Sequence, residues 1–203
     1  INLDEGDELV FVMCTHGEKD VILATRNGLA TRFSESDVRV MGRTARGVRG
    51  IRLRDGDYVT GVAAVEDGKM LVTVTENGYG KRTFDDFRLM KNRGGMGVTC
   101  HNINDKTGKL AGIAAVSDDE DLMFITDSGV IVRTPVSGIN RYSRTASGVI
   151  CMRLGEGQKL IGFTTVAREE EEESAAEESS AGAESSFEEG APGSASPADV
   201  SAE

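Results

Sequence analysis

The chain has 203 residues, a formal net charge of −11 and a sequence pI near 4.8, values that taken alone argue against a nucleic-acid partner. The charge is uneven, because residues 169–203 hold 12 of the 34 acidic residues and no Lys or Arg. Residues 1–168 therefore carry 23 basic against 22 acidic side chains, a net charge of +1. The acidity of the whole chain therefore does not argue against a nucleic-acid partner for residues 1–168.

Other classes of protein are excluded by what the sequence lacks. No stretch approaches the roughly 18 apolar residues of a membrane span, and no secretory signal pattern is present. The two histidines and three cysteines are dispersed, so we expect no zinc site and no disulfide framework, as in a protein of a reducing cytoplasm. Because the chain starts at Ile1 without an initiator Met, we expect it to be part of a longer protein.

Short apolar runs rich in β-branched residues follow one another from the N-terminus, at residues 9–13, 21–25, 29–33 and 48–53. Several of them alternate with polar residues, which is typical of strands, and almost no helical period is visible. Asn27-Gly28 separates the second run from the third, and Asn-Gly supplies the positive φ angles of a two-residue hairpin turn. The sequence therefore predicts a strand, a hairpin and a further strand before residue 54.

The same order of elements recurs about every fifty residues. Two sets of glycines have spacings of 50 and 51, namely Gly28, Gly78 and Gly129, and Gly47, Gly97 and Gly148. A connecting segment typified by IRLRDGDYVTGV appears four times, so three repeats follow the end of an earlier one. About four strands per repeat indicate an all-β, propeller-like array of four-stranded antiparallel blades. Three blades do not close a ring, so we expect further blades upstream.

The last segment, residues 169–203, differs in kind from the repeats. Apart from Phe187 and Val200 it has almost nothing to bury, so burial would not offset the conformational entropy lost on ordering. We therefore expect two parts, a domain of three blades over residues 1–168 and a disordered acidic C-terminal tail over residues 169–203.

Two columns of basic residues recur with the repeats, although a solvated surface has no folding reason to keep a charge. One column follows each hairpin turn and the other precedes each second glycine, where backbone amides are accessible. The first comprises Arg32, Arg82 and Arg133, joined by Lys81; the second comprises Arg43, Arg93 and Arg144, flanked by Arg39, Arg46, Arg49, Lys91 and Arg141.

Each column would form a stripe on successive blades, and arginine binds phosphate bidentately. The pattern therefore predicts double-stranded DNA held by its backbone with little reading of bases. Salt bridges between blades and protein binding are the alternatives. The second column is the stronger candidate for phosphate binding, because an arginine beside loop glycines packs against fewer neighbouring residues than an arginine within a strand.

No catalytic, cofactor-binding or metal-binding residue is expected in the chain, nor a small-molecule ligand. KNRGGMG, at residues 91–97, invites comparison with a nucleotide-binding loop, but it lacks the Lys-Ser/Thr and the following helix of a P-loop. GRTARG and YSRTASG hold the same place in the other repeats without the extra glycines. KNRGGMG is therefore one of three equivalent blade loops.

Four segments carry a resemblance to a known family: ENGYGKRT, MGRTARGVRGIRL, ITDSGVIVRTPVSGI and RTASGVICMRL. In this order they resemble the later blades of the DNA gyrase A C-terminal domain family, found in bacterial type IIA topoisomerases. The resemblance covers residues 1–167, and NGYGKR is more similar to gyrase than to its relative topoisomerase IV. The family's signature loop, Gln-Arg-Arg-Gly-Gly-Lys-Gly, is only partly matched by KNRGGMG, which indicates a degenerate copy in a later blade.

The resemblance implies a six-bladed β-pinwheel whose basic rim wraps DNA and so supports ATP-dependent negative supercoiling. It implies that ATP and Mg²⁺ are bound elsewhere in the parent enzyme, a heterotetramer in the bacterial cytoplasm that contains two copies of gyrase A together with gyrase B. This chain would itself be non-catalytic. The alternatives are the C-terminal domain of the corresponding topoisomerase IV protein and a protein-binding β-propeller scaffold.

Overall fold

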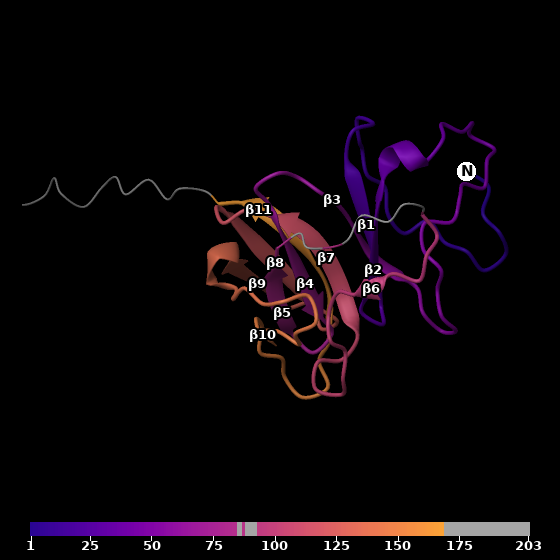
Figure 1. The fold of residues 1–203 in the computed structure, drawn as a ribbon. Coiled ribbons are helices and arrows are strands. Elements are labelled where there is room, and N and C mark those ends of the chain that lie inside the picture. The colour runs from indigo at the N-terminus through magenta and orange to yellow at the C-terminus, as the bar shows by residue number, and fades with distance from the viewer. Residues whose placement is uncertain (85–86, 88–92, 169–203) are drawn as a thin grey trace, which may run out of the picture. The chain divides into compact units, whose positions relative to one another are not determined.

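In a computed structural model of the chain, the structure describes residues 1–84, 87 and 93–168, which belong to one compact unit, Ile1–Arg168 (Figure 1). The predicted disordered tail, residues 169–203, lies outside the described residues, as does Lys91. Among the described residues there are eleven strands, two short 3-10 turns and no α-helix. The expected all-β class is confirmed.

The strands form three antiparallel sheets, which we call the first, second and third blades. The first has the order β3-β1-β2-β6, the second β10-β5-β4-β7 and the third β11-β8-β9. The strands are β1 (Asp20–Thr25), β2 (Leu29–Ser34), β3 (Val59–Ala64), β4 (Met70–Thr75), β5 (Tyr79–Thr83), β6 (Val98–Thr99), β7 (Leu110–Val116), β8 (Glu120–Thr126), β9 (Ile131–Pro135), β10 (Val149–Ile150) and β11 (Leu160–Ala167); the turns are η1 (Glu35–Asp37) and η2 (Val136–Gly138).

Each blade is built on one of the predicted hairpins, but the strands of the first and second blades come from two repeats. The short strands β6 and β10 each lie one repeat further along the chain than the hairpins they join. Thr99 of β6 pairs with Leu29 of β2, and Ile150 of β10 pairs with Tyr79 of β5. The sequence period therefore gives the number of strands per blade, but one strand of each of these two blades is supplied by the following repeat. We call this arrangement strand exchange.

Glycines make this exchange sterically possible. Gly97 and Gly148 precede β6 and β10 with positive φ angles of 75° and 69°. A Cβ atom would lie 2.6 Å from the carbonyl oxygen of Ala30 at Gly97, and 2.4 Å from that of Gly80 at Gly148. Since real Cβ atoms do not approach backbone oxygens so closely, only glycine lets the incoming chain reach the edge of the hairpin.

Two of the predicted strands are wrong, the runs at residues 9–13 and 48–53, because neither forms a strand. Their equivalents one repeat later are β3 and the β6 region, and each of these pairs with a hairpin earlier in the chain. For the first two runs the sequence contains no such hairpin. Leu9 and Val12 accordingly remain 61% and 82% exposed. Among the described residues the third blade has three strands, and the strand that completes the other two blades comes in each case from one repeat later.

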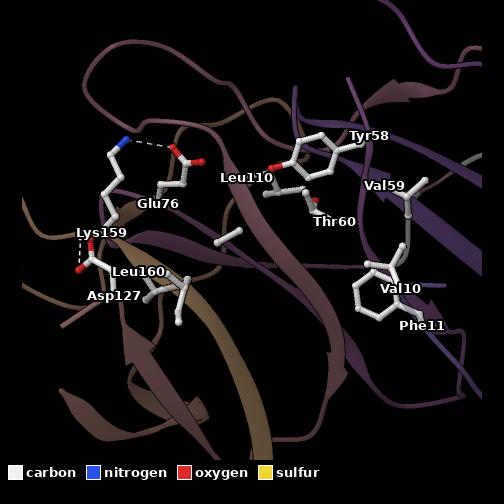
Figure 2. A pocket seen from close by; sticks show the side chains of 12 residues that line it. Val10, Phe11, Tyr58, Val59, Thr60, Glu76, Leu110, Asp127, Lys159 and Leu160 are labelled. Carbon is white, nitrogen blue, oxygen red and sulfur yellow. Dashed lines mark hydrogen bonds and ion pairs between the residues drawn. The ribbon is translucent and has the colours of Figure 1, made fainter. Parts of the chain in front are cut away.

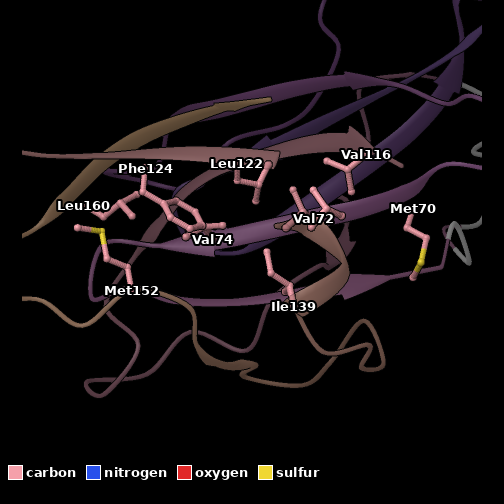
Figure 3. Close-up of a cluster of buried hydrophobic side chains, with 10 residues drawn as sticks. Met70, Val72, Val74, Val116, Leu122, Phe124, Ile139, Met152 and Leu160 are labelled. Carbon is pink, nitrogen blue, oxygen red and sulfur yellow. The ribbon is translucent and has the colours of Figure 1, made fainter. Parts of the chain in front are cut away.

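Two hydrophobic clusters join the blades. The larger, shown in Figure 3, includes Val72 and Val74 of β4 and Leu122 and Phe124 of β8, all with 0% exposure. Phe124 also meets Phe163 of β11 edge to face, with ring centroids 6.1 Å apart. A second cluster, containing Ile22, Ala24, Leu71 and Ile113, packs the first blade against the second. Because the blades share these cores, each is buried largely by its neighbours.

Candidate nucleic-acid interface

The strand arginines of the first and third blades are paired with carboxylates across their own hairpins. Arg32 Nε lies 2.8 Å from Asp20 Oδ2, and Arg133 Nε lies 2.7 Å from Asp121 Oδ2. Burial alone would raise the pKa of Asp121, but hydrogen bonds from Arg133 and Arg168 outweigh it and lower that pKa. These arginines are therefore engaged in local ion pairs.

The second blade breaks this pattern, because Met70 stands where the other blades have the aspartate. Arg82 is 5% exposed and turns instead toward the following repeat. Its Nε donates to the carbonyl oxygen of Ile139 at 2.6 Å and its Nη2 to that of Ser137 at 3.1 Å, while Nη1 contacts Asp118. Arg82 thus ties β5 to the segment that follows the third hairpin.

Lys81, which the sequence placed among the phosphate ligands, is completely buried. Its Nζ donates to the carbonyl oxygens of Ser143, Arg144 and Ala146 at 2.8, 2.6 and 2.7 Å. Direct contact between Lys81 or Arg82 and DNA would require these buried bonds to break. Neither residue is therefore available for direct contact with DNA in this structure.

The loop arginines are placed differently from one repeat to the next. Arg43 is exposed, and no ion pair of the described residues involves it. Arg93 is half-buried. Arg144 is also half-buried, with its Nη1 donating to the carbonyl oxygen of Thr99 and its Cζ 6.0 Å from the centre of the Phe87 ring. Only the first loop therefore presents its column arginine fully to solvent.

Further exposed arginines surround Arg43, and we call Arg39, Arg43, Arg46 and Arg49 the arginine loop. Within the described part of the chain, the only ion pair of this loop joins Arg46 to Asp4 at 2.7 Å. That pair is 74% and 56% exposed, so it contributes little to stability and does not immobilise Arg46. The arginine loop is thus a basic surface almost free of carboxylate partners.

Two further exposed arginines were not predicted. Arg52 and Arg54 are exposed and follow the arginine loop directly. The search for recurring basic residues did not find them, because the equivalent positions of the next repeat are Asn102 and Asn104. Arg141, which was predicted, is exposed but pairs with Asp118 at 2.9 Å.

One cavity between blades, about 440 Å³ in volume, has a lining of apolar side chains together with Glu76, Asp127 and Lys159 (Figure 2). Glu76 accepts from Arg26 Nη2 at 2.6 Å and from Lys159 Nζ at 3.2 Å. Burial would raise the pKa of Glu76, but these two cations lower it. Asp127 accepts from the Lys159 amide at 3.1 Å. Both carboxylates of this cavity therefore already accept hydrogen bonds within the protein.

The described residues contain no group of three or more His, Cys, Asp or Glu side chains that could hold a metal ion. They also contain no helix long and apolar enough to cross a membrane.

A family model described as DNA gyrase C-terminal domain, beta-propeller, matches residues 1–16, 19–66, 69–117 and 120–167. The chain belongs to this family. The four matched stretches correspond to the end of one repeat and the three repeats that follow it. The family suggested by the sequence motifs is thereby confirmed.

Among its relatives, the DNA gyrase A protein of Staphylococcus epidermidis is 47% identical over 161 residues, 78% of this chain and 18% of that protein. The DNA gyrase A protein of Aminobacterium colombiense is 44% identical over 170 residues, 83% of this chain and 21% of that protein. The chain therefore spans about a fifth of the length of these relatives.

Solved structures agree with this assignment of the fold. The C-terminal domain of DNA topoisomerase IV has a TM-score of 0.76 at 26% identity, covering 82% of this chain and 52% of that one. The DNA gyrase A C-terminal domain has a TM-score of 0.69 at 28% identity, covering 74% and 52%. The higher identity to the gyrase A proteins favours gyrase over topoisomerase IV.

Proposed function

We propose that this chain is part of the DNA-wrapping domain of a DNA gyrase A protein and binds the backbone of double-stranded DNA. The observation that carries the proposal is the arginine loop, in which Arg39, Arg43 and Arg49 are exposed and have no carboxylate partner among the described residues. A guanidinium group without a partner keeps its donors available for phosphate oxygens.

The mode of binding follows from the fold. Among the described residues there is no α-helix that could enter a major groove, and the exposed cations lie on loops. Phosphate contacts from loops position a duplex without reading its sequence, which suits a protein that bends DNA at many places. Wrapping along successive blades would extend the contact beyond one loop.

In the parent enzyme this domain supports ATP-dependent negative supercoiling by a type IIA topoisomerase and is not itself catalytic. ATP and Mg²⁺ are bound by other parts of the complex, which includes gyrase B and a second copy of gyrase A. DNA as the partner places the protein in the bacterial cytoplasm. The names of the relatives support this proposal.

The proposal is tested by measuring DNA affinity against salt, with the full chain and a linear duplex in a mobility-shift titration. We expect log affinity to fall steeply with log salt, by about 0.9 for each phosphate neutralised. Replacing Arg43 and Arg49 by Ala should weaken binding about tenfold at low salt and reduce this slope by about two.

The matched control replaces Lys106 and Lys159 by Ala, which removes the same charge from exposed positions outside the arginine loop. This control should keep the wild-type slope. Affinity that does not depend on salt would overturn the proposal and leave protein binding as the better explanation. Equal effects of the two double variants would remove the arginine loop from the interface.

A further inference from the structure

One loop of the second blade is held by its carbonyl groups. We call residues 143–148 the held loop, because Lys81 Nζ donates to the carbonyl oxygens of Ser143, Arg144 and Ala146 within 2.6 to 2.8 Å. Lys81 is completely buried, so these oxygens point toward the interior of the blade. Three carbonyl groups of one short loop therefore face the same way.

His101 orients a fourth carbonyl of the held loop. Its Nε2 lies 3.0 Å from the Ser147 oxygen and its Nδ1 lies 3.0 Å from Thr73 Oγ1. Because a carbonyl oxygen only accepts, Nε2 carries the hydrogen, and Nδ1 accepts from the threonine hydroxyl. Burial, followed by the charge of Lys81, lowers the pKa of His101 to about 4, so the ring is neutral at pH 7.

The direction of the carbonyl groups fixes the direction of the amides. In a planar trans peptide the N–H of the next residue points opposite to the C=O. The amides of Thr145, Ser147 and Gly148, together with that of Arg144, therefore point away from Lys81 and His101, and no hydrogen bond between described residues uses them. Successive outward amides next to a glycine at positive φ, here 69° at Gly148, form an anion-binding nest.

We propose that the held loop binds one phosphate of the DNA backbone through these four amides, with Lys81 and His101 as positioning residues. The inference rests on the proposed function, because it takes DNA as the source of the phosphate. It assigns Lys81 a role different from direct contact with DNA. The lysine acts from inside the blade, by turning the peptide groups of a surface loop.

A loop elsewhere in the chain provides a comparison. Arg43-Thr44-Ala45 has the same sequence as Arg144-Thr145-Ala146, and both loops contain the same turn bond of 3.1 Å, from Ala45 N to Gly42 O and from Ala146 N to Ser143 O. Within the described residues, however, no side chain donates to the carbonyl groups of the first loop. The nest is thus expected in the held loop and not in the loop at residues 42–45.

The experiment uses the full chain labelled with ¹⁵N and records amide shifts during titration with inorganic phosphate and then with a short DNA duplex. We expect the amides of Arg144, Thr145, Ser147 and Gly148 to shift in both titrations. In the phosphate titration Thr44 should stay nearly unchanged. These measurements need no substitution, so they test the nest even if a variant does not fold.

Lys81→Met tests the positioning role, with Thr31→Val at the equivalent position of the first blade as the control. Lys81→Met should abolish the amide shifts and weaken DNA binding about three- to tenfold, the effect of losing one or two hydrogen bonds. Its salt slope should equal that of the wild type, because neutral amides displace no cation from DNA. Thr31→Val should leave the shifts and the affinity unchanged.

Three outcomes would overturn the inference. A slope reduced by about one in Lys81→Met would show direct contact between the ammonium group and a phosphate. Wild-type amides that stay still while DNA binds elsewhere would remove the nest and leave the proposed function intact. Amide shifts that survive in folded Lys81→Met would show that the loop needs no support from the lysine. Failure of DNA to bind at all would instead contradict the proposed function.

Discussion

At the scale of single residues, buried polar side chains of the second repeat, residues 69–117, bond to backbone carbonyl groups of the third repeat. Lys81, Arg82 and His101 are all at most 5% exposed, and each donates to at least one such carbonyl group. A buried donor that lost its acceptor would bear the full cost of desolvation. These three residues therefore couple the stability of the second repeat to the chain that follows it.

The pKa of His101 makes folding stability depend on pH. The folded value, about 4, lies below the ordinary value of 6.5, so the unfolded chain binds the proton first as the pH falls. Stability is present above pH 6.5 and is lost between pH 6.5 and 4. We expect the free energy of unfolding in urea to drop by about 2 kcal/mol from pH 7 to pH 5. His101→Gln should remove most of this drop, whereas His16→Gln, at an exposed position, should retain it.

The three thiols should differ in reactivity. Burial raises the pKa of Cys100 to about 12 and that of Cys151 to about 11, while Cys14 is exposed. Since the thiolate is the reactive form, we expect iodoacetamide at pH 8 to modify Cys14 alone in the folded protein. Mass spectrometry should show one adduct, and three after unfolding in urea. Rapid modification of Cys100 without urea would contradict the buried placement.

The roles of individual arginines were only partly predictable from the sequence. The columns treated Arg32, Arg82 and Arg133 alike, since a repeat shows that a charge recurs but not what it contacts. A usable signal was present, because Asp20 and Asp121 each lie twelve residues before their arginine, a spacing that makes them diagonal neighbours across the hairpin. Nothing comparable in the sequence pointed to the distant carbonyl groups that surround Lys81.

At the scale of elements, the glycines before β6 and β10 decide whether the strand exchange can form. Gly97 and Gly148 combine a positive φ with a backbone oxygen where a Cβ would be, whereas Gly47, in the same column, has a φ of 85° and open space around it. Substituting Gly47 therefore tests the cost of a positive φ alone, whereas substituting Gly97 or Gly148 adds the clash with a backbone oxygen.

Gly148→Ala should destabilise the protein by about 3 kcal/mol, since it adds a clash with the Gly80 oxygen to the strain of a positive φ. Gly47→Ala bears the strain alone and should cost about 1 kcal/mol. Thermal or urea unfolding measures both values. Equal losses in the two variants would mean that the approach of β10 to β5 does not depend on glycine.

The elements were more predictable than their partners. Asn27-Gly28 and the alternating runs around it predicted the β1–β2 hairpin correctly, because turn type and side-chain period are local properties. The partner of β6 is a non-local property. The runs at residues 9–13 and 48–53 have the composition of strands, yet they form none without a hairpin to pair with.

At the scale of the whole molecule, the net charge is divided unevenly along the sequence. Residues 1–168 carry +1 and residues 169–203 carry −12, which together give the total of −11. Twelve carboxylates tethered to a domain with an arginine loop would compete with DNA phosphates at high effective concentration. The sequence alone carries this prediction.

Removing residues 169–203 should therefore tighten DNA binding about three- to tenfold at about 50 mM salt, and the difference should shrink as salt screens the carboxylates. A chain of unchanged length, with Glu replaced by Gln throughout that segment, separates charge from length and should bind like the truncated chain. If neither change alters the affinity for DNA, the segment does not compete with DNA, and its charge would serve only to keep the protein soluble.

The exchange of strands between blades also bears on how such arrays change in length. Each repeat completes the hairpin before it and leaves its own hairpin to be completed by the repeat after it. Inserting or deleting one whole repeat, wherever its boundaries fall, therefore leaves the two ends of the array unchanged. One end still has a segment that can add a strand to a preceding blade, and the other still has a hairpin that can accept one. Gene duplication can vary the number of blades in this architecture without inventing a new edge.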